Sequence, residues 1–231
     1  MDIHGLQKLT LLDFPGKLAC TVFLAGCNYR CPFCHNAELI DRGAPVQMDD
    51  ERLLSFLRTR QGMLDGVAFT GGEPLLSPGL PELIRKIRAL GYAVKLDTNG
   101  SLPDRLRALL DEGLIDYAAM DIKNSPARYA ETVGLPSCDL RPVRESVTLL
   151  MEGRVEYEFR TTAVAELHDA DSFRAIGEWI RGARRWALQV FTDRDTVAYA
   201  GLHAPDAAAL RQYAEIMRPC VDEVIVRGAE L

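Results

Sequence analysis

The stretch "LACTVFLAGCNYRCPFC", residues 18–34, joins an apolar run to three closely spaced cysteines. Residues 18–24 are apolar almost throughout, which is typical of a parallel strand that is covered on both faces. Cys27, Cys31 and Cys34 then follow, with three and two intervening residues. The cysteines therefore lie just past the carboxyl end of the first expected strand, where a tight loop can turn three thiols toward one point.

Outward from this stretch, the chain repeats a unit of a short apolar strand, a turn and an amphipathic helix. The expected strands are residues 18–24, 66–70, 93–97, 117–122, 155–161, 187–191 and 223–226. The expected helices, with apolar residues at helical spacing, are residues 53–57, 80–90, 106–110, 143–151, 173–180 and 210–217. This alternation predicts right-handed βαβ crossovers and a parallel sheet.

The alternation predicts an α/β fold in one domain, residues 1–231, and the number of units allows a partial (βα)6 TIM-like barrel with parallel strands. A complete eight-fold barrel needs about 250 residues. A doubly wound sheet is the alternative that the pattern leaves open. Residues 1–17 are expected to be an amino-terminal lead-in, and residues 192–231 to hold a carboxy-terminal helix and strand. In either architecture, ligands bind at the carboxyl ends of the strands.

The composition is ordinary for a globular protein, with 48% hydrophobic and 26% charged residues and a formal net charge of −6. An acidic chain offers no general attraction to phosphates, so no nucleic acid partner is expected. The amino terminus does not resemble a signal peptide, and the longest apolar stretch is too short for the about 20 residues of a membrane helix. We therefore expect a cytoplasmic protein with no membrane partner, whose clustered cysteines are ligands rather than disulfides.

The cysteine trio fits two kinds of metal centre. Thiolate ligands favour zinc or an iron–sulfur cluster. A structural zinc site needs a fourth ligand, and His35 is the nearest candidate although it adjoins Cys34. A four-iron cluster can instead use three cysteines and leave one iron open, as a catalytic metal centre requires. The pattern favours a cluster on Cys27, Cys31 and Cys34, with zinc as the alternative.

The later strands end in glycine or polar residues, at the edge of the sheet where a ligand would bind. These strand ends are "FTGGEP" (69–74), "LDTNG" (96–100), "MDIK" (120–123), "YEFR" (157–160) and "ALQVF" (187–191). Gly71 and Gly72 let the backbone approach a ligand closely. Arg160 is suited to pair with a ligand carboxylate or with a neighbouring glutamate. Each of these residues alone could equally belong to a turn or to a local ion pair. Their common location at one edge of the sheet is what indicates a site.

The spacing C-x3-C-x2-C after a first strand, with an aromatic residue before the last cysteine, resembles the motif of radical S-adenosylmethionine (SAM) enzymes. The resemblance implies one [4Fe-4S] cluster whose open iron binds the amino and carboxylate groups of SAM. The reduced cluster then passes an electron to the sulfonium, which cleaves to methionine and a 5′-deoxyadenosyl radical. Chelation of SAM at the cluster fixes the short distance that this transfer needs.

Within this family, the strand ends look most like those of glycyl-radical-enzyme activases. The resemblance implies that Gly71, Gly72 and Glu73 bind the methionyl ammonium group of SAM. It also implies a monovalent cation beside the SAM carboxylate, held by Asp97, Thr98, Asp121 and the backbone carbonyl of Ala119. Lys123 is the candidate catalytic residue, expected to approach the cofactor or a peptide substrate. The remaining expected cofactor contacts are Phe33, which could equally belong to the core, His35, Arg160 and Gln189.

The opening "LQKLTLLDFPGKLACTVFLAGCNYRCPFCHN", residues 6–36, resembles activating proteins of anaerobic ribonucleoside-triphosphate reductase, and the similarity continues to "DEVIVRG" at residues 222–228. It implies an oxidoreductase that abstracts a hydrogen from one glycine of a glycyl radical enzyme, with electrons from flavodoxin or ferredoxin. Gln189 stands near the point where pyruvate formate-lyase activases carry a histidine, which favours a sister group. The alternatives are an activase of another glycyl radical enzyme, a radical SAM enzyme acting on a pterin, similar to 7-carboxy-7-deazaguanine synthase, and a non-enzymatic zinc or iron–sulfur protein.

Overall fold

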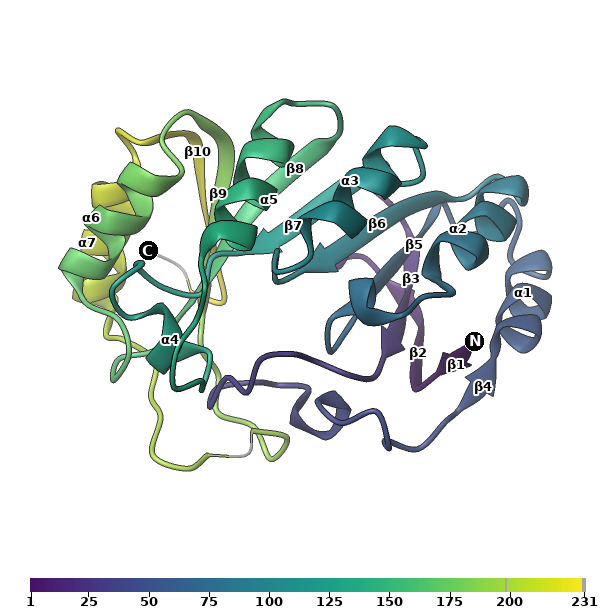
Figure 1. Cartoon of the computed structure of the whole chain (residues 1–231), viewed down its shortest axis with the longest axis horizontal. Helices are drawn as coiled ribbons and strands as arrows, with labels where there is room; N and C mark the ends of the chain where they lie inside the picture. The colour runs from purple at the N-terminus through teal and green to yellow at the C-terminus, as the bar shows by residue number, and fades with distance from the viewer. Residues whose placement is uncertain (198, 230–231) are drawn as a thin grey trace.

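An eight-stranded sheet forms the centre of the computed structural model, which describes residues 1–197 and 199–229 (Figure 1). Its strands are β2 Gly5–Thr10, β3 Ala19–Leu24, β5 Gly66–Gly71, β6 Ala93–Thr98, β7 Tyr117–Asp121, β8 Glu156–Ala163, β9 Ala183–Val190 and β10 Val221–Arg227. They lie in the order β10-β9-β8-β7-β6-β5-β3-β2. All neighbours are parallel except β2, which pairs antiparallel with β3 at one edge. A separate two-stranded sheet joins β1 (Asp2–Ile3) to β4 (Met48–Asp49).

Every step from one parallel strand to the next passes through a helix, and Figure 1 shows α2, α3 and α5 on the same side of the strands. The helices are α1 Asp50–Arg58, α2 Leu80–Ala89, α3 Pro103–Asp111, α4 Tyr129–Thr132, α5 Arg141–Met151, α6 Ala170–Trp179 and α7 Ala207–Met217, with short 3-10 turns η1 Ala37–Leu39 and η2 Pro74–Leu76. Six strand–helix units and a closing parallel strand confirm the predicted partial (βα)6 barrel. Within the described residues, none of these helices has the length and apolar character needed to cross a membrane.

The helix starts follow from local chemistry. The side chains of Asp49, Asp169 and Asp206 accept hydrogen bonds from backbone N–H groups in the first turns of α1, α6 and α7. These bonds satisfy donors that have no partner within the helix. Proline opens α2, α3 and α5, where its missing N–H costs nothing and its fixed φ suits the first turn.

The strand ends differ from the predicted ranges by a few residues, and the largest difference is at β9. This strand begins at Ala183 instead of at the predicted residue 187. Arg184 and Arg185 interrupt the apolar run in the sequence, which hid the start of the strand. The Arg185 guanidinium is accommodated on the inner face, where it donates to Glu223 at 2.7 Å and to the Tyr117 hydroxyl at 3.2 Å.

The amino-terminal lead-in predicted for residues 1–17 contains β1 and the edge strand β2, neither of which was predicted. Gln7, Lys8 and Leu9 are all exposed, so β2 shows no apolar alternation that could reveal a strand. The predicted carboxy-terminal helix and strand are present as α7 and β10. Of the predicted range 192–231, residues 198, 230 and 231 lie outside the described residues.

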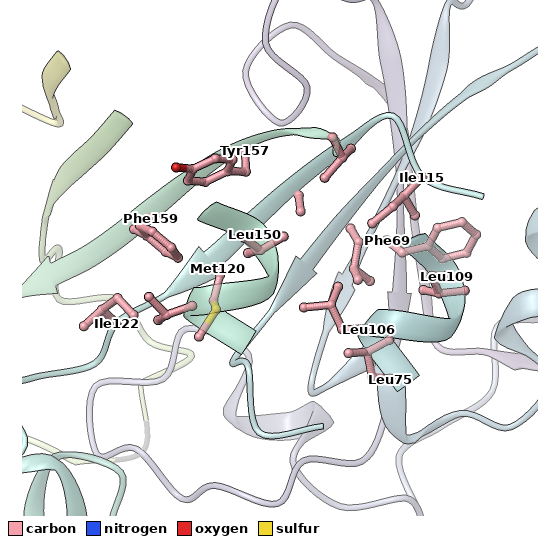
Figure 2. Close-up of a cluster of buried hydrophobic side chains, with 14 of the residues drawn as sticks. Phe69, Leu75, Leu106, Leu109, Ile115, Met120, Ile122, Leu150, Tyr157 and Phe159 are labelled. Atoms are coloured by element: carbon pink, nitrogen blue, oxygen red, sulfur yellow. The ribbon is translucent and has the colours of Figure 1, made fainter. Parts of the chain in front are cut away.

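The main core lies between the sheet and the helices, as Figure 2 shows for the region under α3 and α5. Met120 of β7 and Phe159 of β8 are fully buried in one cluster with Leu106 of α3 and Leu150 of α5. Burial of each such side chain contributes about 1.5–3 kcal/mol. Because side chains alternate along a strand, the residues between these apolar ones face the inside of the barrel.

The inner face has its own small apolar cluster at the amino ends of the strands. Phe14, which is 2% exposed, packs with Ala19, Tyr117 and Ala119. Its ring centroid lies 6.2 Å from that of Tyr117, and its ring approaches the backbone of Gly66 so closely that a Cβ there would lie 2.9 Å from it. Phe14 therefore closes the amino-terminal end of the barrel, and the opposite end is left for a ligand.

Replacement of Phe14 by alanine is expected to lower the free energy of unfolding by about 3–5 kcal/mol, because it leaves a cavity that the surrounding strands cannot fill. Leu12→Ala is the matched control, since Leu12 lies in the same segment but is 88% exposed. Its effect should stay within about 0.5 kcal/mol. Urea unfolding of both variants measures the difference, and equal losses would contradict the role given to Phe14.

Candidate functional site

A cavity of about 240 Å³ lies at the carboxyl ends of the parallel strands. It is lined by most of the residues predicted for the site, namely Cys27, Cys31, Phe33, Cys34, His35, Gly71, Gly72, Asp97, Thr98, Asp121, Lys123, Arg160 and Gln189. Glu73 and Ala119 are the two predicted site residues that do not line it. The strand order explains the convergence, because residues far apart in sequence meet wherever parallel strands end at one edge.

The cysteine loop is fixed to the protein at several points. Backbone hydrogen bonds join Gly26 N–H to Leu39 and Cys27 N–H to Ile40, both at 2.8 Å. The Arg30 N–H donates to Val133 at 2.8 Å on the other side of the loop. These bonds tie the backbone of the loop to the segments on both sides of it.

The three thiols fit a group that takes thiolate ligands. All six cysteines are free, and Cys27, Cys31 and Cys34 line the cavity together. Burial raises the pKa of the Cys31 thiol to about 12 although the Lys123 ammonium lowers it. A thiolate at this position therefore needs a strongly positive partner, and ligated iron provides one.

His35 does not act as the fourth ligand that the zinc alternative requires. Its ring stacks on Phe191 with centroids 5.5 Å apart, and its Nε2 lies 2.7 Å from the carbonyl oxygen of Thr192. Among residues 1–197 and 199–229, no three His, Cys, Asp or Glu side chains are placed to hold a single metal ion. The arrangement therefore favours the cluster over a closed zinc site.

The glycine pair allows β5 to end directly against the cysteine loop. A Cβ on Gly71 would lie 2.3 Å from the carbonyl oxygen of Leu24, and one on Gly72 would lie 2.3 Å from that of Gly26. Gly71 also has φ +115°, a conformation that favours glycine. The Asn36 side chain donates to the Gly71 carbonyl at 3.1 Å. The two glycines thus present bare backbone to the cavity beside the thiols.

The Glu73 carboxylate, predicted to contact the SAM ammonium, is held by several donors of the protein. It is 1% exposed and accepts hydrogen bonds from the Leu75 N–H at 3.1 Å, the Thr98 hydroxyl at 2.9 Å and the Asn99 N–H at 2.7 Å. Burial raises its pKa to about 7, against the lowering effect of these donors. Glu73 therefore ties the end of β5 to the end of β6, outside the lining of the cavity.

Charged side chains form the wall of the cavity opposite the cysteines. The Arg160 guanidinium bridges two carboxylates, with Nη1 3.2 Å from Asp97 and Nε 2.8 Å from Asp121. Lys123 Nζ lies 2.9 Å from the other oxygen of Asp121. Burial alone would raise the pKa of Asp121, but Arg160 and Lys123 outweigh it and hold the pKa well below its usual range. Arg160 thus pairs with the aspartates of the site, and not with a surface glutamate.

Lys123 and Phe33 lie side by side in the cavity. The Lys123 ammonium is 5.9 Å from the centroid of the Phe33 ring, within the range of a cation–π contact. Phe33 is 4% exposed and belongs to the main core while it also lines the cavity, so the two roles left open by the sequence are compatible. Gln189 also lines the cavity, and its Oε1 lies 3.5 Å from the Thr162 hydroxyl.

Several lining residues were not predicted from the sequence, including Tyr29, Asn99 and Thr162. The Asn99 side chain donates to Asn28 at 2.9 Å and approaches the Cys27 sulfur at 3.9 Å, so it links β6 to the cysteine loop. Asn99 directly follows the predicted Thr98, and Tyr29 lies between the predicted Cys27 and Cys31, so position in a predicted site segment is the signal that could have identified them.

Comparison with models of protein families identifies the family of this protein. The model of the radical SAM superfamily matches residues 21–171. The chain belongs to the radical SAM superfamily. The predicted cofactors, one [4Fe-4S] cluster and SAM, are confirmed by this membership because they are the cofactors of the family. The protein is therefore a radical SAM enzyme.

Among curated proteins, this radical SAM enzyme is 29% identical to a protein of Methanocaldococcus jannaschii that is provisionally named a glycyl-radical enzyme activating enzyme, over 97% of this chain and 95% of the relative. It is 36% identical to 7-carboxy-7-deazaguanine synthase of Methanopyrus kandleri, over 48% of this chain and 51% of the relative. Among solved structures, Streptococcus suis SuiB bound to the precursor peptide SuiA has a TM-score of 0.71 at 15% identity, over 95% of this chain and 50% of SuiB. The structural likeness supports the fold alone.

Proposed function

We propose that this radical SAM enzyme activates a glycyl radical enzyme by abstracting a hydrogen atom from the Cα of one of its glycines. The observation that carries the proposal is the match along nearly the whole chain, 97% of this protein and 95% of the relative, to a protein named as such an activating enzyme. The opening residues 6–36 favour anaerobic ribonucleoside-triphosphate reductase as the partner. Flavodoxin or ferredoxin is the proposed electron donor.

The residues that line the cavity would have different roles in this reaction. Cys27, Cys31 and Cys34 would hold the cluster. When bound, the cluster supplies the electron that cleaves SAM to methionine and a 5′-deoxyadenosyl radical. Gly71 and Gly72 bring backbone close to the cofactor, and Arg160 offers its guanidinium to the SAM carboxylate. Together these contacts would orient SAM, so that its ribose is aimed at the substrate.

A glycine is a suitable substrate for a cavity of this size. Because glycine has no side chain, its Cα can enter a narrow site that other residues could not. Lys123 is half-buried between Asp121 and the ring of Phe33, at the wall where an incoming peptide would pass the cofactor. Its ammonium can donate to a peptide carbonyl, and this is the role that we propose for it.

The second candidate function is catalysis on a small molecule such as a pterin. It is favoured by the similarity to 7-carboxy-7-deazaguanine synthase, which is higher in identity but covers 48% of this chain and 51% of that enzyme. This match leaves about half of each protein unaligned. Similarity over the whole length therefore favours the activase.

The proposal predicts a glycine-centred radical on the partner enzyme. The anaerobically reconstituted protein, reduced and supplied with SAM, should produce this radical on a reductase from the same organism, and electron paramagnetic resonance detects it. A reductase with its target glycine replaced by alanine is the control and should give no signal. Cleavage of SAM without a radical on any glycyl radical enzyme of that organism, together with turnover of a pterin, would instead support the second function.

A further inference from the structure

Lys95 is a buried cation next to the site that the sequence did not identify. It lies on β6 two residues before Asp97, so both side chains point to the inside of the barrel. The side chain is 2% exposed, and its ammonium contacts the Asp97 carboxylate. A lysine is almost never fully buried unless it is paired, so this contact accounts for its position.

The carboxylates expected to hold a monovalent cation are already paired with side chains of the protein. Asp97 receives Lys95 on Oδ1 and Arg160 on Oδ2. Asp121 receives Arg160 on Oδ1 and Lys123 on Oδ2. All four carboxylate oxygens of the two aspartates therefore face a positively charged nitrogen. The arrangement does not fit a metal cation between Asp97 and Asp121.

Of the two other expected ligands, Thr98 is engaged with different partners, and Ala119 is not among the residues that line the cavity. The Thr98 hydroxyl donates to Glu73 at 2.9 Å and accepts from the Gly100 N–H at 3.1 Å. Ala119 is fully buried in the inner cluster with Phe14 and does not line the cavity. We infer that Lys95 and Arg160 take the place of the monovalent cation, so that this enzyme binds SAM without one.

The balance of charge supports the same conclusion. Asp97 and Asp121 are together surrounded by three cationic side chains, those of Lys95, Lys123 and Arg160. These side chains already neutralise the two carboxylates, so the attraction of the pair for a metal cation is reduced, whereas the carboxylate of SAM would be attracted to the cationic groups.

Lys95 is held in place by a layer of side chains beneath the site. Its ammonium lies 6.0 Å from the centroid of the Tyr117 ring, a cation–π contact. Nearby, the Glu158 carboxylate forms a two-pronged pair with Arg227 of β10, at 2.8 and 2.7 Å. Burial raises the pKa of Glu158, but Arg227 and then the more distant Arg160 and Lys95 outweigh it, and the pKa is lowered. The Lys95 ammonium is therefore held by several buried neighbours and is not part of an exposed surface ion pair.

The test compares potassium with choline, a cation too large for the site, at equal ionic strength. For the wild-type protein, the thermal midpoint of the cluster-free form and the rate of SAM cleavage by the reconstituted form should be the same in both salts. Lys95→Ala removes the ammonium and opens space beside Asp97. Its midpoint should fall by about 5 °C or more in choline and recover in potassium, and its SAM affinity should fall about tenfold and recover likewise.

Lys86→Ala is the matched control, because Lys86 is 40% exposed and lies on the outside of α2. It should show neither the loss nor the potassium effect. Saturable, potassium-specific stabilisation or activation of the wild-type protein would overturn the inference, and so would a Lys95→Ala variant that behaves like Lys86→Ala. If Lys95→Ala does not fold, the comparison of the wild-type protein in potassium and in choline still tests the inference. Neither measurement involves a partner enzyme, so the result is independent of the proposed activase function.

Discussion

Replacement of Cys31 by alanine is expected to abolish both the cluster and the cleavage of SAM. Cys31 is 8% exposed and lines the cavity between the two other thiols of the loop. With two thiols left, a four-iron cluster would lack one of its three protein ligands and would not survive purification. Iron content should fall from about four atoms per chain to near zero, with loss of the cluster's visible absorption. Formation of 5′-deoxyadenosine should fall to background.

Cys138→Ala is the matched control for this loss. The Cys138 thiol is partly exposed and lies 3.9 Å from the Tyr29 hydroxyl, but it does not line the cavity. The variant should keep the full iron content and the wild-type rate of SAM cleavage. If Cys31→Ala retained four irons, or if Cys138→Ala lost as much as Cys31→Ala, the cluster would be bound by a different set of cysteines.

The parts of the site that the sequence predicted are those set by local spacing and by strand ends. The interval between Cys27 and Cys34 confines three thiols to one loop whatever the rest of the chain does. Asp97, Asp121 and Arg160 converge because parallel strands bring their carboxyl ends to one edge, and this rule needs only the order of strands and helices. The fold class followed from the same alternation.

The parts that the sequence did not predict depend on which partner a polar side chain meets in three dimensions. For example, the Glu73 carboxylate accepts hydrogen bonds from three donors at or just after the ends of β5 and β6, which the sequence does not show. Lys95 interrupts an apolar strand and reads as an ordinary exposed residue. Its position two residues before Asp97 was a signal, because residues at this spacing share a face. The residue pattern alone does not show that this face is the inside of the barrel.

Phe14 shows a similar limit for the core. It lies in an irregular segment with no apolar period, between a strand that was missed and the first predicted strand. Its burial depends on the small residues Ala19, Ala119 and Gly66, which leave room for the ring at the amino end of the barrel. The hydrophobic period of a sequence indicates which residues share a face of one helix or strand. It cannot predict that residues of different elements fit together in this way.

Replacement of Gly71 by alanine is expected to destabilise the protein strongly and to disturb the cysteine loop. The new Cβ would lie 2.3 Å from the carbonyl oxygen and 2.6 Å from the nitrogen of Leu24, so the backbone of β3 or β5 must move. The cost of this movement adds to that of φ +115°, and the free energy of unfolding should fall by more than about 3 kcal/mol. Urea unfolding of the cluster-free protein measures this loss.

Gly91→Ala separates the two contributions, because Gly91 has φ +93° but no atom within 4 Å of an added Cβ. It should lose only the about 1–2 kcal/mol that a left-handed residue costs, and equal losses in the two variants would contradict the steric argument. The Leu24 carbonyl also accepts the Gly72 N–H at 2.8 Å, and Gly26 follows two residues later at the start of the cysteine loop. A shift at Leu24 would therefore displace Cys27, so Gly71→Ala should lower the iron content and the SAM affinity while Gly91→Ala changes neither.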